Sequence, residues 1–275
     1  MTPRRIRRHR CPCLARRQRP GGFTLIELLT VIAILALLVA IFAPALTLAM
    51  QLAYATICRT NLHEMGTAMQ LYKSHTGFYP PGHSWAPIQP ANVITWAPNL
   101  RLYASGAKEK LFYCPTAPRI ARWEVGFGSG LPAKWGYADD ETRLYWNTPF
   151  SYGYNNWGTR DFAHPQVGLG SMADWIPELL GNDPRRLKDW GPLRAHRVAA
   201  PANMLAIGDS RVDGIWDAFI DHNQPGEFPH DAHLGRTNIL FCDGRVGTEY
   251  SADLIDPTYT NPEARRRWNN DNQPH

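Results

Sequence analysis

The sequence FTLIELLTVIAILALLVAIFAPALTLAM, residues 23–50, contains one charged side chain, that of Glu27. About 20 apolar residues in a helix, at ~1.5 Å each, cross the ~30 Å hydrocarbon core of a bilayer. The stretch therefore predicts a membrane-spanning helix over residues 23–50. A carboxylate in such a helix costs up to ~2.5–3.5 kcal/mol at the membrane centre, so we expect Glu27 to have a partner or a function.

The segment before this stretch is rich in arginine. Eight arginines and no acidic residue precede Phe23, whereas the first cation after the span is Arg59. Because the positive side of a span stays in the cytoplasm, the sequence predicts a cytoplasmic N-terminus and an exported C-terminal part. A secretory signal has an apolar region of only about 7–15 residues followed by a small-x-small cleavage site, and this segment fits neither condition.

The residues around the start of the span resemble a known processing site. Gly22-Phe23-Thr-Leu-Ile-Glu27-Leu-Leu is similar to the cleavage motif of type IV prepilins and of the pseudopilins of type II secretion. The resemblance implies that a prepilin peptidase removes a leader, residues 1–22, by cutting after Gly22, and methylates the amino group of Phe23. It also implies that Glu27 pairs with the amino terminus of a neighbouring subunit, a charge pair that is costly to break in an apolar setting.

The helix is predicted to continue as an amphipathic extension over residues 51–77, with Gly77 as its stop. One apolar stripe recurs at spacings of four, three, four and three residues: Cys58, Leu62, Met65, Met69 and Tyr72. We expect a sheet to pack on this stripe. The fold is then α+β and pilin-like, a long N-terminal helix, membrane-spanning in its first half, packed on a loop-rich antiparallel β-sheet head.

Composition indicates one sizeable exported domain besides the helix. The chain has 275 residues, 44% hydrophobic and 19% charged. Its net charge of +5 becomes −3 without the eight leader arginines (+5 − 8), so the mature chain lacks the basic surface that binding to nucleic acid requires. We divide the rest into a head, residues 78–260, and a polar tail, residues 261–275, that we expect to be flexible.

The head is rich in aromatic residues and in turns. All ten tryptophans follow the first helix, and short runs at 143–147 and 150–154 predict a mainly antiparallel sheet. An exposed aromatic surface would indicate a binding site, for glycans for example. Most such residues pack in cores, however, and the strand order between 78 and 201 stays open.

The five cysteines divide by location. Two lie in the leader, and Cys58, Cys114 and Cys242 remain in an oxidising compartment, where disulfides form. We expect Cys58 to pair with Cys114 and Cys242 to be buried as a thiol. The sequence alone does not fix this connectivity.

A second signature lies near the C-terminus. The segment His233-Leu-Gly-Arg-Thr-Asn-Ile-Leu-Phe-Cys-Asp243-Gly244 resembles the H-X9-DG element of prepilin-like proteins of planctomycete-type bacteria. Runs at 238–242 and 245–250 predict a hairpin with a positive φ at the Asp-Gly turn. At ~3.3 Å per extended residue, His233 and Asp243 lie on the order of 20 Å apart and form no catalytic dyad. We expect Asp243 to order the turn and His233 to anchor the loop before the strand.

Acidic residues and histidines are crowded between positions 209 and 233: Asp209, Asp213, Asp217, Asp221, His222, His230, Asp231 and His233. Carboxylates suit Ca²⁺, and the resemblance adds that some pseudopilins hold calcium in a C-terminal loop. Asp213, Asp217 and Asp221 are the calcium candidates. Neither an EF-hand loop nor an HExxH element is present, so a solvated loop without a metal or other cofactor is the simpler interpretation.

These features predict a structural subunit rather than an enzyme, since the sequence has no G-x-S-x-G element. We expect an inner-membrane protein that is processed by prepilin peptidase. It would assemble with other pilin or pseudopilin subunits, on an inner-membrane platform, into a type IV pilus or a type II secretion pseudopilus. The alternative is an exported binding module, for glycans or calcium, that uses the helix only as an anchor.

Overall fold

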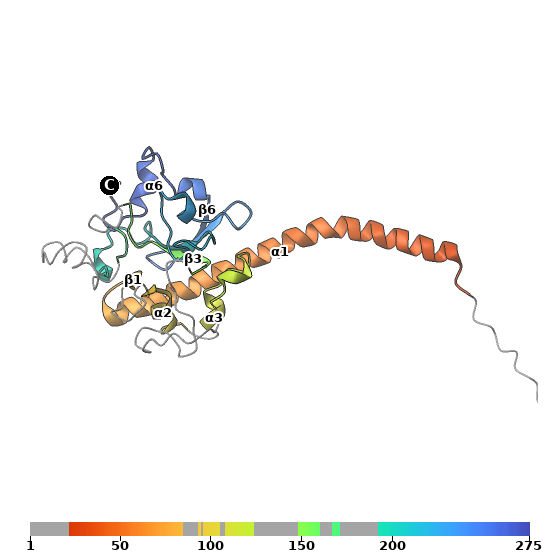
Figure 1. Cartoon of the computed structure of the whole chain (residues 1–275), viewed down its shortest axis with the longest axis horizontal. Helices are drawn as coiled ribbons and strands as arrows, with labels where there is room; N and C mark the ends of the chain where they lie inside the picture. The colour runs from red at the N-terminus through yellow and green to blue at the C-terminus, as the bar shows by residue number, and fades with distance from the viewer. Residues whose placement is uncertain are drawn as a thin grey trace, which may run out of the picture. The chain divides into compact units, whose positions relative to one another are not determined.

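The computed structural model describes residues 22–84, 93–94, 96–104, 108–123, 148–159, 167–170 and 192–275. The described chain divides into two units between Thr47 and Leu48, the second of which, Leu48–His275, is the head with the later part of the first helix (Figure 1). The predicted leader lies outside the described residues except for Gly22, and the predicted strand at 143–147 lies outside them entirely.

Helix α1 (Leu25–Thr76) contributes to both units. Its apolar side chains up to Met50 are largely exposed, and within the described ranges α1 is the one helix long and apolar enough to span a membrane. The long N-terminal helix predicted from the sequence is confirmed.

The later part of α1 buries one face in the head. Four side chains of the predicted stripe are fully buried: Cys58, Leu62, Met65 and Met69. The helix ends at Thr76 because Gly77 adopts a φ of 79°, and the Gly77 N–H donates to the Lys73 carbonyl at 2.8 Å. The amphipathic stripe and its stop are as predicted.

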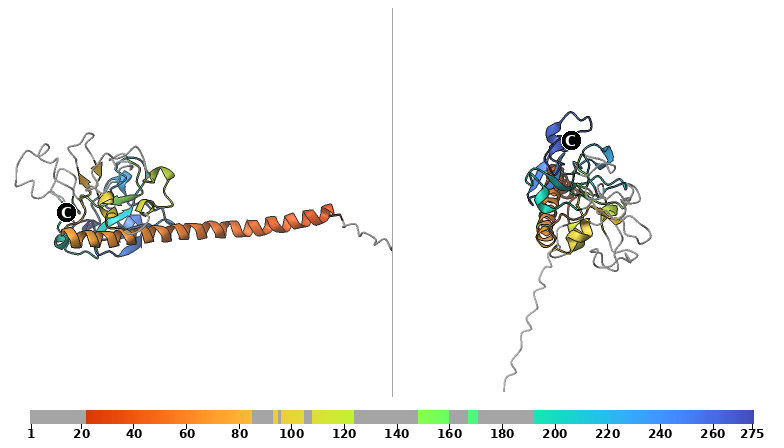
Figure 2. Two further views of the ribbon diagram at one scale, coloured as in Figure 1. Left: turned by 90° about the horizontal axis from the view of Figure 1, so that it is seen from below. Right: turned by 90° about the vertical axis from the view of Figure 1, so that its left-hand side faces the viewer.

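The head contains a four-stranded antiparallel sheet in the order β3-β4-β5-β6. Its strands are β3 (Tyr152–Tyr154), β4 (Leu205–Asp209), β5 (Thr237–Phe241) and β6 (Val246–Glu249). A smaller antiparallel pair joins β1 (His83–Ser84) to β2 (Val93–Ile94). Figure 2 shows the head portion of α1 running beside the strands. This arrangement confirms the pilin-like α+β layout. It gives the order of the strands that lie within the described residues.

Among the described residues of the head, short helices lie between the strands and after the last of them. The α-helical segments there are α2 (Trp96–Arg101), α3 (Lys108–Leu111) and α6 (Pro262–Arg266). The 3₁₀ turns are η1 (Arg119–Ala121), η3 (Ala195–Arg197), η4 (Pro225–Glu227) and η5 (Ser251–Asp253).

The sheet has a hydrophobic core on each face, because successive strand side chains point to opposite sides. On β5, Leu240 belongs to the core shared with α1, whereas Ile239 and Phe241 pack with Trp268 in a second core. The helix approaches the sheet closely at Gly66. A Cβ there would lie 2.7 Å from Leu240 Cδ1 and 3.2 Å from the Gly244 carbonyl oxygen, so any larger residue would have to displace the Leu240 side chain.

The last residues of the chain are folded, which corrects the predicted flexible tail at 261–275. Asn261 caps α6 through its side chain, and Trp268 is fully buried in the second core. The Arg267 carbonyl accepts a hydrogen bond of 2.8 Å from the Leu205 N–H of β4. The sequence-based interpretation gave weight to the polar residues of this segment and overlooked the free energy gained by burying one tryptophan.

Candidate functional site

The predicted processing segment begins α1 with a capping box. Thr24 Oγ1 accepts a hydrogen bond from the Glu27 N–H at 3.3 Å. In return, Glu27 Oε2 accepts from the Thr24 N–H at 2.9 Å and from its hydroxyl at 2.7 Å. Such a reciprocal pair satisfies backbone donors that the first turn of a helix leaves free. Glu27 thus has a partner within its own chain, Thr24. Thr24 directly follows Phe23, the predicted first residue of the cleaved protein.

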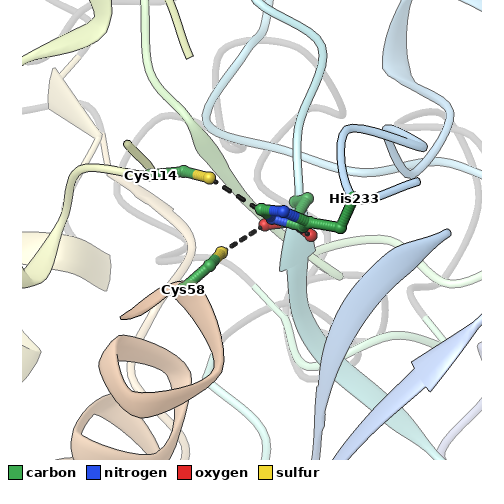
Figure 3. Close-up of side chains that lie close together, drawn as sticks. Cys58, Cys114 and His233 are labelled. Carbon is green, nitrogen blue, oxygen red and sulfur yellow. Dashed lines mark hydrogen bonds and ion pairs between the residues drawn. The ribbon is translucent and has the colours of Figure 1, made fainter. Parts of the chain in front are cut away.

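Four side chains from distant parts of the head meet in a second place, and we call them the four-residue cluster: Cys58, Cys114, Asp209 and His233. Their ligand atoms all lie within 4.8 Å of one another. Each side chain is buried, with residue exposures of 0, 2, 1 and 4%. Figure 3 shows a dashed line from the Cys114 sulfur to the His233 ring, with Cys58 approaching the same place from α1.

Local structure explains two of these positions. Cys58 lies on the buried stripe of α1, one turn before Leu62. Cys114 follows α3, and its backbone N–H donates to Ser151 Oγ at 2.9 Å, which fixes the loop against the residue preceding β3.

The sheet supplies the other two members. Asp209 is the last residue of β4. His233 precedes β5 in a tight turn, where Leu234 and Gly235 have positive φ values of 56° and 77°. His233 and Arg236 exchange two backbone hydrogen bonds across this turn, of 3.0 and 3.1 Å. The turn holds the imidazole at the end of the strand.

Polar contacts connect the cluster. The Cys58 thiol donates to Asp209 Oδ1 at 2.8 Å, and Asp209 Oδ2 accepts from the Asn238 N–H at 2.7 Å. His233 Nε2 lies 3.4 Å from both Asp209 Oδ2 and Cys114 Sγ. Every member therefore contacts at least one other.

Two hydroxyl groups surround the sulfur atoms. The Tyr152 hydroxyl lies 3.1 Å from Cys58 Sγ, and Thr116 Oγ1 lies 3.0 Å from Cys114 Sγ. Each sulfur thus has a polar neighbour in addition to a cluster partner.

The environment separates the protonation states of the two thiols. The neighbouring Cys58 side chain, and after it His233, lower the pKa of Cys114 to about 6, whereas burial raises the pKa of Cys58. Burial alone would lower the pKa of His233, but hydrogen bonds with Asp209 and Cys114 outweigh it and raise this pKa to about 10. Both shifts favour the charged forms, a thiolate at Cys114 and an imidazolium at His233.

A thiolate beside an imidazolium is also the arrangement of a cysteine nucleophile. Reactive cysteines, however, occupy partly exposed sites. Cys114 and His233 are both buried, so their arrangement favours a structural role.

The structure brings Cys58 and Cys114 together, as the predicted pairing requires, but both are free thiols. Cys242 is also a buried free thiol, outside the cluster. All four cluster residues are candidates from the sequence, but under three separate hypotheses. Cys58 and Cys114 belong to the predicted disulfide, Asp209 to the acidic interval and His233 to the C-terminal motif. The sequence alone does not join them, because their contacts span up to 151 residues of sequence.

The second signature has the predicted local geometry at its turn. Asp243 Oδ1 accepts from the Arg245 N–H at 2.9 Å, and Gly244 has a φ of 96°. This turn joins β5 to β6 as the expected hairpin. His233 enters the strand from a turn of its own, and its imidazole has the cluster contacts described above.

The three calcium candidates form hydrogen bonds that order their own loop. Asp217 accepts from the backbone N–H groups of Gly214 and Phe150, at 3.0 and 3.2 Å. Asp213 and Asp221 each accept from the N–H two residues ahead, at 3.0 and 2.6 Å. These are Asx turns, which stabilise a loop without a metal.

The burial of Glu227, which lies beside these aspartates, predicts that the stability of the head depends on pH. Burial raises the pKa of Glu227 to about 8, with Asp221, Asp213 and Asp217 adding to the rise. The folded head then holds a proton that the unfolded chain releases above its ordinary pKa of about 4.3. This contribution to stability is full below that value and is lost as the pH rises to about 8.

We therefore expect Glu227→Gln to raise the melting temperature more at about pH 9 than at about pH 5. Thermal unfolding of the detergent-solubilised chain at both pH values measures the difference. Equal shifts at the two pH values would contradict the prediction. Adding CaCl₂ to the wild type at the higher pH tests the calcium hypothesis separately, since a bound ion would raise the melting temperature.

Comparison with protein families gives a match to the prokaryotic N-terminal methylation motif, at residues 17–43. The matched range includes Gly22, Phe23 and Glu27. It supports a type IV pilin-like protein that is a substrate of prepilin peptidase, and together with α1 it fits a protein anchored in the inner membrane. No significant match was found among curated proteins or among solved structures.

Proposed function

We propose that this chain is a structural subunit that is cleaved after Gly22, methylated at Phe23 and assembled with other pilin-like subunits into a type IV pilus or a type II secretion pseudopilus. The observation that carries the proposal is the methylation motif at residues 17–43, which leads directly into the exposed apolar part of α1. In this proposal the arginine-rich leader is cytoplasmic and the head is exported.

Mass spectrometry of the membrane-extracted chain tests the processing step. With prepilin peptidase present, we expect a mature protein that starts at N-methylated Phe23, and without the peptidase a chain that retains residues 1–22. An intact leader in the presence of active peptidase would overturn the proposal. The chain would then be a head held by an ordinary signal anchor.

The capping box makes a sharper test of assembly possible. Glu27 has two separable roles, as a cap for Thr24 and as a charge for a neighbouring subunit. Glu27→Gln keeps the cap, because glutamine also closes a capping box, but it removes the charge. Thr24→Ala removes the hydroxyl of the cap and keeps the charge.

We expect Glu27→Gln to abolish recovery of the subunit in sheared or purified filaments and Thr24→Ala to leave most of it. Both variants should be cleaved after Gly22, and immunoblotting of membranes is the control that checks this cleavage. Normal assembly of Glu27→Gln, or equal loss in both variants, would contradict a role for charge pairing. An anchored binding module, in contrast, would be insensitive to both changes.

A further inference from the structure

We propose that the four-residue cluster binds one zinc ion, with Cys58, Cys114, Asp209 and His233 as its ligands. Sulfur, imidazole nitrogen and carboxylate oxygen are the donors that Zn²⁺ uses in proteins. Four protein ligands complete its tetrahedral coordination. The site would therefore be structural, in a subunit that needs no open coordination position.

The distances fit such an ion. With Zn–N and Zn–O near 2.0 Å and Zn–S near 2.3 Å, the ligand atoms of a tetrahedral site lie about 3.3–3.8 Å from one another. His233 Nε2 is 3.4 Å from Asp209 Oδ2 and 3.4 Å from Cys114 Sγ. Cys58 Sγ also lies within 4.8 Å of every other ligand atom. Only small side-chain movements are needed to admit the ion.

Burial and charge favour the same conclusion. Asp209 is 1% exposed and Cys58 is fully buried, so an anionic group here is costly unless a cation compensates it. A Zn²⁺ ion would offset two of the three negative charges that the two thiolates and the carboxylate carry. A disulfide would use the two sulfurs and leave Asp209 and His233 with only each other as charged partners, at 3.4 Å, whereas one zinc ion accounts for all four side chains.

An outer layer of hydrogen bonds is already in place. Asp209 Oδ2 accepts from the Asn238 N–H, and hydroxyls of Tyr152 and Thr116 lie at the two sulfurs. Partners of this kind orient ligands and tune their charge in metal sites. The proposed ion would join α1 to β4, to the turn before β5 and to the loop after α3. It would thus fix the helix in the head, and its binding free energy would contribute to folding.

The test is the metal content of the full chain, purified in detergent under reducing conditions without a histidine tag and equilibrated with ZnSO₄. After free metal has been removed, we expect elemental mass spectrometry to find about one zinc ion per chain. Cobalt(II) in place of zinc should give the charge-transfer absorption of thiolate ligands. Cys114→Ser and His233→Ala should lose most of the zinc. Cys242→Ser, a buried cysteine outside the cluster, should retain it.

A measurement on the wild type avoids dependence on variants that fail to fold. Chelation with EDTA should lower the melting temperature, and added ZnSO₄ should restore it. Two results would overturn the proposal. One is a wild-type chain that holds no zinc and shows no chelator effect. The other is a chain isolated without reductant whose mass is two hydrogens lower and whose digest contains a Cys58–Cys114 linked peptide.

Discussion

Trp96→Ala is expected to destabilise the head by about 3–5 kcal/mol, because it removes a large side chain from the centre of the core. Trp96 is fully buried and stacks on Tyr154, with ring centroids 5.6 Å apart. It also meets Phe112 and Phe150 edge to face. Its indole N–H donates to the Ala218 carbonyl at 2.9 Å, and the variant loses this bond, although the carbonyl still accepts from the Tyr154 N–H at 3.0 Å. Urea unfolding followed by tryptophan fluorescence measures the loss.

Two further variants control this measurement. Trp96→Phe keeps an aromatic ring and loses the N–H donor, so it should cost less than Trp96→Ala. Ile120→Ala, at a position 70% exposed, should change the stability by less than about 0.5 kcal/mol. A Trp96→Ala variant as stable as Ile120→Ala would show that the aromatic residues do not form the core. Glycan binding through this side chain would then become a serious alternative.

Trp268→Ala is expected to destabilise the head by a similar amount, about 3–5 kcal/mol, although it lies only seven residues from the end of the sequence (275 − 268). The ring is fully buried against Ile239 and Phe241, and its N–H donates to the Leu254 carbonyl at 2.7 Å. Removing it should also make the α6 segment susceptible to limited proteolysis. Unfolding curves and the sizes of the proteolytic fragments provide the two readouts.

Arg266→Ala is the matched control for Trp268. Arg266 is the last residue of α6, two residues before Trp268, and its 3.2 Å ion pair with Glu263 is largely exposed, so its loss should cost less than about 1 kcal/mol. If Trp268→Ala were equally mild, the C-terminal segment would contribute nothing to the core. The sequence-based prediction of a flexible tail would then be correct in solution.

The sequence predicted well whatever depends on local pattern. The apolar run, the stripe from Cys58 to Met69 and the stop at Gly77 depend only on residues close together in the sequence. Each of them agrees with the structure. The Asp243-Gly244 turn is equally local, since the glycine supplies the positive φ that the hairpin requires. The fold class followed from these elements.

Long-range contacts were beyond this reasoning. The Cys58 thiol and the Asp209 carboxylate meet across 151 residues, and no periodicity relates them. The sequence shows that acidic residues are crowded between positions 209 and 233. Of these aspartates, Asp209 at the end of the buried strand β4 joins the four-residue cluster. Asp213 and Asp221 instead accept hydrogen bonds from the backbone of their own loop. Trp268 was misjudged for a related reason, because a polar neighbourhood in sequence says little about which core a single ring can reach.

The spacing of nine residues between His233 and Asp243 corresponds to a distance along helix α1. At one end His233 meets the cluster at Cys58, and at the other the Cys242 carbonyl accepts from Gln70 Nε2 at 3.2 Å. From Cys58 to Gln70 is twelve helical residues (70 − 58), or about 18 Å along the axis. The extended residues 237–242, at ~3.3 Å each, cover a similar distance of about 20 Å. An insertion or deletion of one residue within 234–242 would separate one end from its contact and turn the following side chains to the wrong face, so spacing, more than the identity of the intervening residues, should define this signature.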